Sequence, residues 1–210
     1  MLFSATDSVD VAPGVVLFRG AVESAAEALL SETEQIIAVS PLRRVMTPMG
    51  KPMSVEMTNC GSVGWISDRT GYRYESIDPV TNQSWPTMPA LFADTATEFA
   101  SLAGYRDFVP DVCLINRYSL GSKMGLHQDR DETDFSQPIV SVSLGLPITF
   151  KIGGQRRTDP TVSTKLQHGD VLVFGGPARL AFHGVGKLSA GLHYSCGFTR
   201  WNLTFRRARE

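Results

Sequence analysis

The sequence predicts an α+β fold in which a double-stranded β-helix, or jelly roll, carries two outer helices and a long flap. Three observations predict this fold. Apolar residues recur three or four positions apart in two segments of the first half of the chain, and the period changes to two after residue 111. A long stretch between the two helical segments follows neither period. Short alternating strands that follow helices are typical of a double sheet with helices packed outside it.

The chain is long enough for one domain with a substantial core, because it has 210 residues and 42 % of them are hydrophobic. We therefore expect a single domain over residues 1–210, with its jelly-roll core in residues 111–206. The formal net charge of −1 gives no whole-protein attraction to nucleic acid. Any binding of that kind must come from a local basic face.

Two amphipathic helices are expected in the first half of the chain. The first covers residues 21–39, where apolar residues and glutamates occupy opposite faces. The second covers residues 89–103, with Pro89 suited to its first turn and Gly104 to its end. We expect both helices to serve packing and to carry no chemistry.

The flap is predicted in residues 40–88, which are dense in Pro, Gly, Thr and Asn. Short hairpins are expected around residues 48–50 and 68–71. A segment this long without its own core is either disordered or functional. Its large aromatic residues carry too much apolar surface for disorder, so we expect a lid over a binding site; they are Trp65, Tyr72, Tyr74 and Trp85.

From residue 111 onward, short strands are separated by Gly, Pro or Asp turns. We expect these strands to form the opposing sheets of a barrel. They cover residues 112–118, 139–144, 149–152, 162–166, 171–174, 181–183 and 200–206.

The cysteines and the hydropathy of the chain bear on its compartment. Cys60, Cys113 and Cys196 are odd in number and far apart, which favours a reducing compartment over a disulfide framework. No apolar run is long enough to cross a bilayer, and the first residues lack the pattern of a secretory signal. We expect a cytoplasmic monomer without membrane association.

Two histidines and a carboxylate are the candidate metal ligands. His127 and Asp129 lie two positions apart, so their side chains share a face of an extended segment. His183 follows a distant strand-like segment that could reach the same ion. Such a set suits non-haem Fe(II), because it leaves one face of the metal open for a co-substrate and O₂. Zinc is the alternative metal. We interpret His168 and His193 as structural.

Residues 200–206 predict a co-substrate site. In a strand, the even-numbered residues, Arg200 and Arg206 among them, share one face, and the apolar residues take the other. Two guanidiniums inside a barrel need anionic partners, because an unpaired buried charge is costly. The dicarboxylate 2-oxoglutarate, which also chelates iron, meets that need. Asn116 and Tyr118 share a face of another strand and suit the same ligand. Surface ion pairs on an edge strand are the alternative for the two arginines.

Several blocks of the sequence carry a family resemblance. They are residues 53–61, 77–79, 113–118, 126–129, 138–147, 168–170 and 202–206. Through these blocks the chain resembles, from about residue 13 to residue 207, the AlkB family of bacterial Fe(II)/2-oxoglutarate-dependent nucleic-acid dealkylases. The blocks lie in both the barrel and the flap, so the resemblance implies that residues 40–88 are a nucleotide-recognition lid.

The resemblance also implies a role for each candidate residue. The iron ligands at the catalytic centre would be His127, Asp129 and His183. The residues that hold 2-oxoglutarate would be Asn116, Arg117, Tyr118, Arg200, Asn202 and Arg206. The contacts to the substrate nucleotide would be Trp65, which stacks on the damaged base, with Tyr72, Arg73, Tyr74, Asp131 and Arg157.

The activity that the resemblance implies is oxidative demethylation of 1-methyladenine and 3-methylcytosine in single-stranded DNA. Fe(II), 2-oxoglutarate and O₂ would be used, and formaldehyde, succinate and CO₂ released. Enzymes that act on a base take it out of the stack and hold it against aromatic faces, which fits the aromatic residues of the lid. Double-stranded DNA stays open as a partner. The alternatives are an RNA or tRNA base demethylase of the same chemistry and a non-catalytic module that binds damaged nucleic acid.

Overall fold

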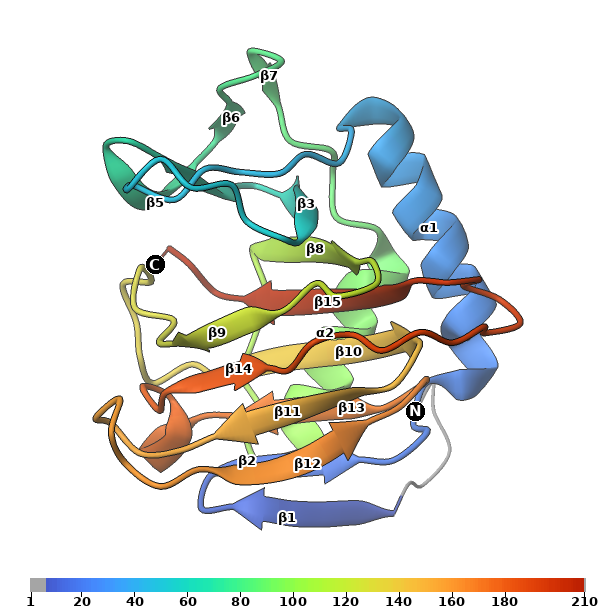
Figure 1. Cartoon of the computed structure of the whole chain (residues 1–210), viewed down its shortest axis with the longest axis vertical. Coiled ribbons are helices and arrows are strands. Elements are labelled where there is room, and N and C mark those ends of the chain that lie inside the picture. The colour runs from blue at the N-terminus through green and yellow to red at the C-terminus, as the bar shows by residue number, and fades with distance from the viewer. Residues whose placement is uncertain (1–6, 210) are drawn as a thin grey trace.

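Two antiparallel β-sheets face each other and form the core of the fold (Figure 1). The computed structural model describes residues 7–209. Within them the larger sheet has seven strands, in the order β1 (Ser8–Ala12), β2 (Val15–Phe18), β13 (Val171–Phe174), β10 (Ile139–Gly145), β15 (Arg200–Arg206), β8 (Val112–Tyr118) and β3 (Glu56–Gly61). The smaller sheet has the order β12 (Val162–Leu166), β11 (Ile148–Ile152), β14 (His183–Val185) and β9 (Met124–His127). This arrangement confirms the predicted jelly roll.

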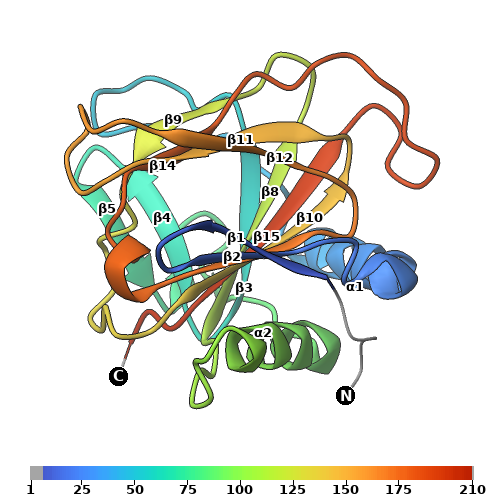
Figure 2. The same ribbon diagram turned by 90° about the horizontal axis from the view of Figure 1, so that it is seen from below.

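Both helices cover the outer face of the larger sheet, so that sheet lies between the helices and the smaller sheet (Figure 2). Helix α1 (Ala26–Val39) follows a short 3-10 turn (Glu23–Ala25), so its first residues depart from the predicted α-helix over 21–39. Helix α2 (Ala90–Leu102) confirms the helix predicted over 89–103, although Pro89 is its N-cap and does not lie in its first turn. The helices bury aromatic residues against the sheet, and the ring of Phe92 meets that of Phe205 edge-on at 5.8 Å.

A second apolar cluster fills the space between the two sheets. Phe150 of β11 and Phe174 of β13 approach each other there, with ring centroids 6.4 Å apart. This packing closes one side of the barrel interior. Four residues of β15 line the rest of this interior: Arg200, Asn202, Thr204 and Arg206.

The predicted lid contains a β-hairpin of β4 (Gly64–Asp68) and β5 (Gly71–Glu75), and its turn confirms the hairpin expected at residues 68–71. A smaller pair, β6 (Ile77–Asp78) and β7 (Gln83–Ser84), follows. Around residues 48–50, a bridge between Met46 and Pro52 closes a tight turn. The strand β3 was not predicted: it lies within residues 40–88 but pairs with β8 at the edge of the larger sheet.

The strands predicted over 112–118, 162–166, 171–174 and 200–206 have the predicted bounds. The strand predicted over 181–183 was placed wrongly, because β14 begins only at His183. Ala181 bonds instead to Ala178, at the end of a 3-10 turn (Gly176–Ala178), and Phe182 bonds to Gly154. In residues 7–209, no helix combines the length and the apolar character needed to span a membrane.

Candidate active site

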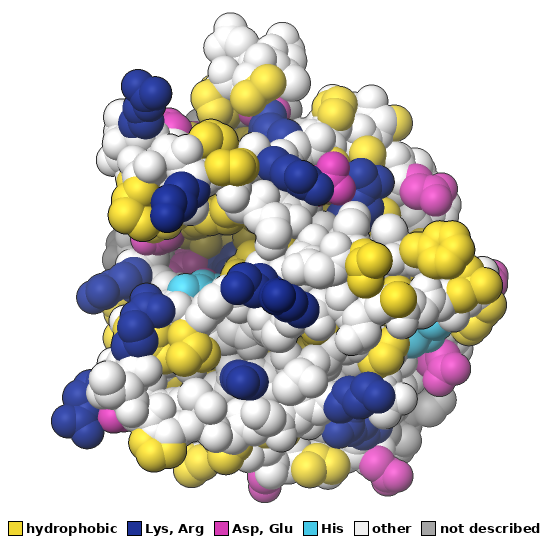
Figure 3. Space-filling model, viewed as in Figure 1, with side chains coloured by type: hydrophobic (Ala, Val, Ile, Leu, Met, Phe, Trp, Pro, Cys, Tyr) yellow, Lys and Arg dark blue, Asp and Glu magenta, His cyan; other side chains and the backbone are white. Residues whose placement is uncertain are grey.

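A cavity of about 730 Å³ opens between the two sheets and the lid hairpin. Figure 3 shows the hollow between the lid and the barrel, with a histidine side chain visible inside it. Most of the predicted site residues line this cavity. They are Trp65, Tyr72, Tyr74, Asn116, Tyr118, His127, Asp129, Asp131, Arg157, His183, Arg200, Asn202 and Arg206.

His127, Asp129 and His183 come together in the cavity as predicted. The antiparallel pairing of β9 with β14 places His127 opposite His183, and their ring centroids are 4.4 Å apart. Nε2 of His127 lies 3.6 Å from Oδ1 of Asp129, and Nε2 of His183 lies 3.8 Å from Oδ2. One ligand atom from each residue lies within 4.8 Å of the others, so the three could hold one metal ion.

The hydrogen bonds of the two histidines leave the correct nitrogen free for a metal. Nδ1 of His127 lies 2.9 Å from the carbonyl oxygen of Gly125, and Nδ1 of His183 lies 3.0 Å from that of Ala181. A carbonyl only accepts, so each Nδ1 carries the proton and each Nε2 presents a lone pair. Burial, together with the neighbouring His127, lowers the pKa of His183 to about 4. The His183 ring is therefore neutral near pH 7, as ligation requires.

Arg206 makes a dense ion-pair network beside these residues. It bonds to Asp129, and its Nε also lies 3.3 Å from Oε1 of Glu132. Arg179 reaches the other oxygen of Glu132 at 3.1 Å. Tyr74 of the lid donates to Oε1 of Glu132 at 2.6 Å. The network thus connects the lid to the candidate metal ligand.

The sequence interpretation missed Glu132 and Arg179. Both side chains are almost completely buried. A signal was present for Arg179, since it is the one charged residue in the otherwise apolar stretch 171–182. Charged residues are rarely buried unless they are paired, so this pattern predicts an acidic partner for Arg179.

Arg200 is buried but lacks an acidic partner. Its side chain donates to Oγ of Ser143 at 2.7 Å and to the carbonyl of Leu146 at 3.3 Å, and its Nε bonds to nothing. Burial lowers its pKa to about 10. Among residues 7–209, no carboxylate pairs with Arg200. A buried guanidinium in this state fits a carboxylate ligand in the cavity.

Further polar groups surround the same space. Oδ1 of Asn116 is buried without a hydrogen-bond partner, and so is Nη1 of Arg206. Tyr118 is buried opposite Arg200 in the pairing of β8 with β15, and burial raises its pKa to about 12, so it stays a neutral phenol. Donors and acceptors without protein partners are what a bound polar ligand would satisfy. The three candidate metal ligands therefore fit Fe(II), and the unpaired polar groups beside them fit 2-oxoglutarate.

Arg117 is a correction to the predicted co-substrate residues, because it does not reach the cavity. Successive residues of a strand point to opposite faces, so Arg117 faces away from the ligand side of its neighbours Asn116 and Tyr118. Its guanidinium bonds to Glu56 at 2.9 Å and lies 5.7 Å from the centre of the Trp201 ring.

Arg73 is a second correction, this time to the predicted substrate contacts. It lies between two cavity-lining tyrosines on β5 and points to the other face of the hairpin. Its side chain pairs with Asp68 at 3.0 Å and with Glu75 at 2.9 Å. Both ion pairs belong to the hairpin itself and lie outside the cavity.

The lid residues contact the barrel inside the cavity. The rings of Trp65 and Tyr72 are stacked, with centroids 5.4 Å apart. Nε1 of Trp65 donates to Oδ2 of Asp131 at 2.9 Å. Burial raises the pKa of Asp131, although the bond from Trp65 opposes that shift. An aromatic platform and a carboxylate therefore stand together near the metal ligands.

A second group, formed by His168, His193 and Cys196, has the residue types of a metal site. Its hydrogen bonds oppose that role. Nδ1 of His168 accepts the N–H of Gly145, and Nδ1 of His193 accepts the N–H of Ser195. In the neutral rings the proton then lies on Nε2, which removes the lone pair that a metal would need. This supports a structural role for both histidines.

The comparisons with known proteins agree with this geometry. A family model described as the 2OG-Fe(II) oxygenase superfamily matches residues 14–206. The alpha-ketoglutarate-dependent dioxygenase AlkB of Salmonella typhimurium is 50 % identical over 95 % of this chain and 93 % of its own length. The DNA N(6)-methyladenine demethylase ALKBH1C of Arabidopsis thaliana is 30 % identical over 83 % of this chain and 42 % of its own.

Among solved structures, that of OsALKBH1 matches with a TM-score of 0.79 and 28 % identity, and covers 95 % of this chain and 100 % of its own. Alpha-ketoglutarate is another name for 2-oxoglutarate, so the names of the relatives agree with the ligand that the buried arginine requires. The chain belongs to the AlkB family of the 2OG-Fe(II) oxygenase superfamily and is a dioxygenase that uses Fe(II), 2-oxoglutarate and O₂.

Proposed function

We propose that this protein is a DNA repair enzyme that oxidatively demethylates 1-methyladenine and 3-methylcytosine in single-stranded DNA. Succinate, CO₂ and formaldehyde are the other products. The AlkB relatives support the dioxygenase reaction, and the name of the Arabidopsis relative supports a methylated base in DNA as its substrate. In this proposal the protein is a cytoplasmic monomer and a single domain, with its catalytic core in residues 111–206 and the lid in residues 40–88.

His127, Asp129 and His183 hold the iron in this proposal. When bound together, Fe(II), 2-oxoglutarate and O₂ supply the chemistry that hydroxylates a methyl group on a ring nitrogen. Arg200 pairs with a carboxylate of 2-oxoglutarate, which its lack of an acidic partner supports. Arg206 keeps Asp129 ionised and oriented and offers its free Nη1 to the ligand; the remaining co-substrate contacts are Asn116, Tyr118 and Asn202.

The position of the Asp131 carboxylate is the observation that carries the assignment of the substrate. Its carboxylate lies in the cavity next to the Trp65 ring. Adenine and cytosine both present an exocyclic amine that can donate to a carboxylate. A base stacked on the aromatic platform of Trp65 and Tyr72 would direct that amine to Asp131. Tyr74 and Arg157 are the further nucleotide contacts in this proposal.

The kind of lesion follows from the cost of flipping a base. A methyl group at N1 of adenine or N3 of cytosine blocks the normal base pair, so the damaged base leaves the helix at little cost. Single strands need no unpairing at all. A chain with a net charge of −1 fits a substrate that is held by stacking and a few phosphate contacts.

The test is repair of an oligonucleotide that carries one 3-methylcytosine, followed by mass spectrometry of the base. Protein loaded with Fe(II) is given 2-oxoglutarate and O₂, and a ribo-oligonucleotide of the same sequence is run in parallel. We expect loss of one methyl group from the DNA, with no repair by His127→Ala and full repair by the matched variant His193→Ala. Faster repair of the RNA would establish the RNA demethylase instead. Binding of the oligonucleotide without turnover by the iron-loaded protein would establish the binding module.

A further inference from the structure

The outer face of the four-stranded sheet has an unusual charge composition. The strands β9, β11, β12 and β14 and the loops at residues 119–123 and 186–199 contain no Asp or Glu. They contain four lysines, all of them exposed: Lys123, Lys151, Lys165 and Lys187. The whole chain has slightly more acidic than basic residues, 21 against 20. A positive face in such a chain is a local feature and does not reflect its composition.

These lysines have no acidic partners. None forms an ion pair with any carboxylate in residues 7–209. Some cations elsewhere on the surface are paired, as in the ion pair of Arg156 with Asp159 and that of Arg19 with Asp170. Unpaired like charges on one face repel one another and raise the local concentration of an anionic partner.

The four side chains follow one another from the mouth of the cavity across the sheet. Lys123 lines the cavity itself. Two backbone hydrogen bonds, from Leu188 to Ser122 and from Gly121 to Leu188, place Lys187 beside the segment that ends in Lys123. Figure 3 shows Lys and Arg side chains next to the hollow and over this sheet.

The pairing of the strands places Lys151 and Lys165 further along the same face of the sheet. Lys151 of β11 pairs with Gly184 of β14 on one side and with Ser163 of β12 on the other. Lys165 lies two residues beyond Ser163, so both lysines project from the same face. The exposed residues between them, Thr149 and Ser163, are small. The surface is therefore positively charged, with small residues between its lysines.

We propose that this face is a second contact surface for DNA, where the four lysines bind phosphates of nucleotides that flank the lesion. The proposal rests on the proposed function, since it extends the path of the DNA strand beyond the cavity. Neighbouring strands are about 4.8 Å apart, so the four strands span about 14 Å. That span corresponds to at most about four phosphates at the spacing of roughly 3.4 Å along one strand.

The test compares DNA binding for oligonucleotides of two lengths, with one central 3-methylcytosine in each. The shorter has about five nucleotides and fills only the cavity, while the longer has about fifteen and can also reach the lysines. The test variant combines Lys151→Gln, Lys165→Gln and Lys187→Gln, and leaves the cavity-lining Lys123 in place. We expect wild-type protein to bind the longer strand at least tenfold more tightly than the shorter, and the variant to lose most of that gain.

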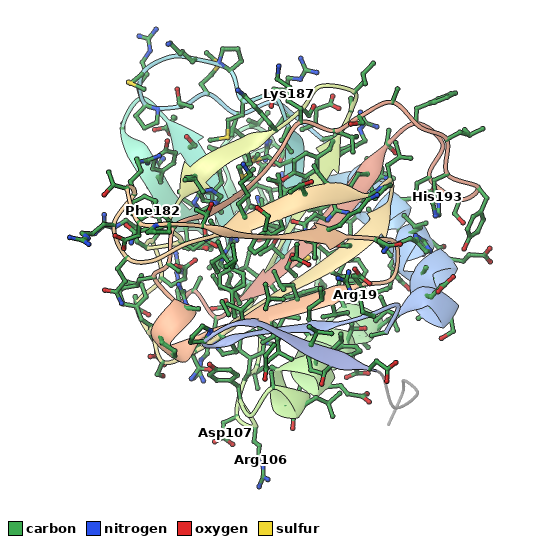
Figure 4. All side chains as sticks on the ribbon, turned by 60° about the horizontal axis from the view of Figure 1, so that its bottom comes forward. Arg19, Arg106, Asp107, Phe182, Lys187 and His193 are labelled. Atoms are coloured by element: carbon green, nitrogen blue, oxygen red, sulfur yellow. The ribbon has the colours of Figure 1, made fainter. Side chains whose placement is uncertain are left out.

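The salt dependence of binding gives a second readout. Each phosphate contact to a single strand contributes about −0.7 to the slope of log affinity against log salt concentration. Loss of three contacts should therefore make the slope for the longer strand shallower by about 2, with no change for the shorter strand. Two variants serve as controls and should behave as wild type. One replaces the same three lysines by arginine, and the other is Arg106→Gln, at the opposite end of the molecule from Lys187 (Figure 4).

The outcomes separate this inference from the proposed function. If wild-type protein repairs the shorter strand and the triple glutamine variant binds both lengths as wild type does, the second surface does not exist. The same holds if wild-type protein gains no affinity with length. Failure of wild-type protein to repair either strand would overturn the proposed function alone, because the binding measurement does not need turnover. Unchanged repair of the shorter strand by the variant would show that its fold is intact.

Discussion

Arg206 donates two hydrogen bonds to a single carboxylate oxygen of Asp129. Its Nε and Nη2 lie 3.0 and 2.6 Å from Oδ2, while the other oxygen, Oδ1, faces His127 Nε2 at 3.6 Å. Burial raises the pKa of Asp129, but the charge and hydrogen bonds of Arg206, together with His183 and His127, outweigh that effect and hold the pKa well below its usual range. One buried cation thus keeps the proposed metal ligand ionised and fixes its orientation.

We predict that Arg206→Gln strongly destabilises the metal-free protein. The substitution leaves Asp129 and Glu132 buried without their cationic partner, and breaking a buried pair in this way costs about 3–5 kcal/mol. The measurement is the free energy of unfolding in urea. Arg117→Gln is the matched control, because its pair with Glu56 is partly exposed and should contribute less than about 1 kcal/mol. Similar losses from the two variants would contradict the assignment.

In contrast to Arg206→Gln, Arg200→Met should leave the stability of the ligand-free protein nearly unchanged and should remove the stabilisation by 2-oxoglutarate. In the ligand-free protein, the cost of burying an unpaired guanidinium offsets its two hydrogen bonds, so we expect a change of less than about 1 kcal/mol. With 2-oxoglutarate at about one hundred times its Kd, wild-type protein should gain about 2.7 kcal/mol, and the variant should gain nothing. Unfolding of metal-loaded protein with and without the ligand measures both effects. An equal gain in the variant would remove Arg200 from the ligand site.

Gly64→Ala should loosen the lid. A Cβ at Gly64 would lie 2.3 Å from Cε2 of the buried Trp85 ring, which the hairpin holds by a bond from Nε1 to the carbonyl of Glu75. Overpacking of this kind costs about 1–3 kcal/mol. We expect a lower melting temperature and a raised KM for the methylated oligonucleotide. Gly125→Ala is the control, since no atom lies within 4 Å of its added Cβ. Equal behaviour of the two variants would show that the lid tolerates the methyl group.

His168 should make the protein sensitive to acid. Burial, and then the neighbouring His193, lower its pKa, while Glu23 acts in the opposite direction. Its Nδ1 already accepts the N–H of Gly145, and its buried Nε2 has no partner. The unfolded chain therefore binds a proton more readily than the native state, so stability is lost as the pH falls below about 6.5.

The test for His168 is the free energy of unfolding from about pH 7 to about pH 5 in wild-type protein and in His168→Asn. Asparagine can still accept the bond from Gly145 through its side-chain oxygen, but it does not titrate. We expect a shallower loss of stability in the variant. Parallel pH curves would mean that His168 does not contribute.

The alternating pattern of residues 200–206 predicted both the strand β15 and the face that it turns to the cavity. A regular period of two over seven residues leaves little freedom in register when one side must pack against helices. The helices α1 and α2 were predictable for the same reason, since their apolar stripes are long. The metal ligands were predicted from the two-residue spacing of His127 and Asp129, which places both side chains on one face of an extended segment, although the strand itself ends at His127.

Other elements could not be predicted, because their local signal is weak or absent. The strand β9, Met124–His127, is short and contains Gly125, which has no side chain to contribute to the pattern. The edge strand β3 shows no regular alternation of apolar and polar residues, and its pairing with β8 depends on contacts distant in sequence. The ion pair of Glu132 with Arg179 likewise depends on a contact distant in sequence, although the single charge of Arg179 in an apolar stretch indicated that this residue needs a partner.

The errors at Arg117 and Arg73 have a different origin. Arg117 lies in a block that resembles the family, and Arg73 lies in the lid to which the resemblance assigns nucleotide contacts. The resemblance alone does not say which way either side chain points. Alternation along the strand does: with Asn116 and Tyr118 on the cavity side, Arg117 must face outward. The same argument places Arg73 on the outer face of its hairpin, between Tyr72 and Tyr74.

The most direct test of the central claim is to count succinate and repaired base in the same sample. Iron-loaded protein is given limiting DNA with one 3-methylcytosine in each strand, and both products are measured as the reaction proceeds. We predict one succinate for each methyl group removed, and neither product from Asp129→Ala. Repair without succinate, or succinate that does not rise when DNA is added, would contradict a 2-oxoglutarate-dependent DNA demethylase at this site.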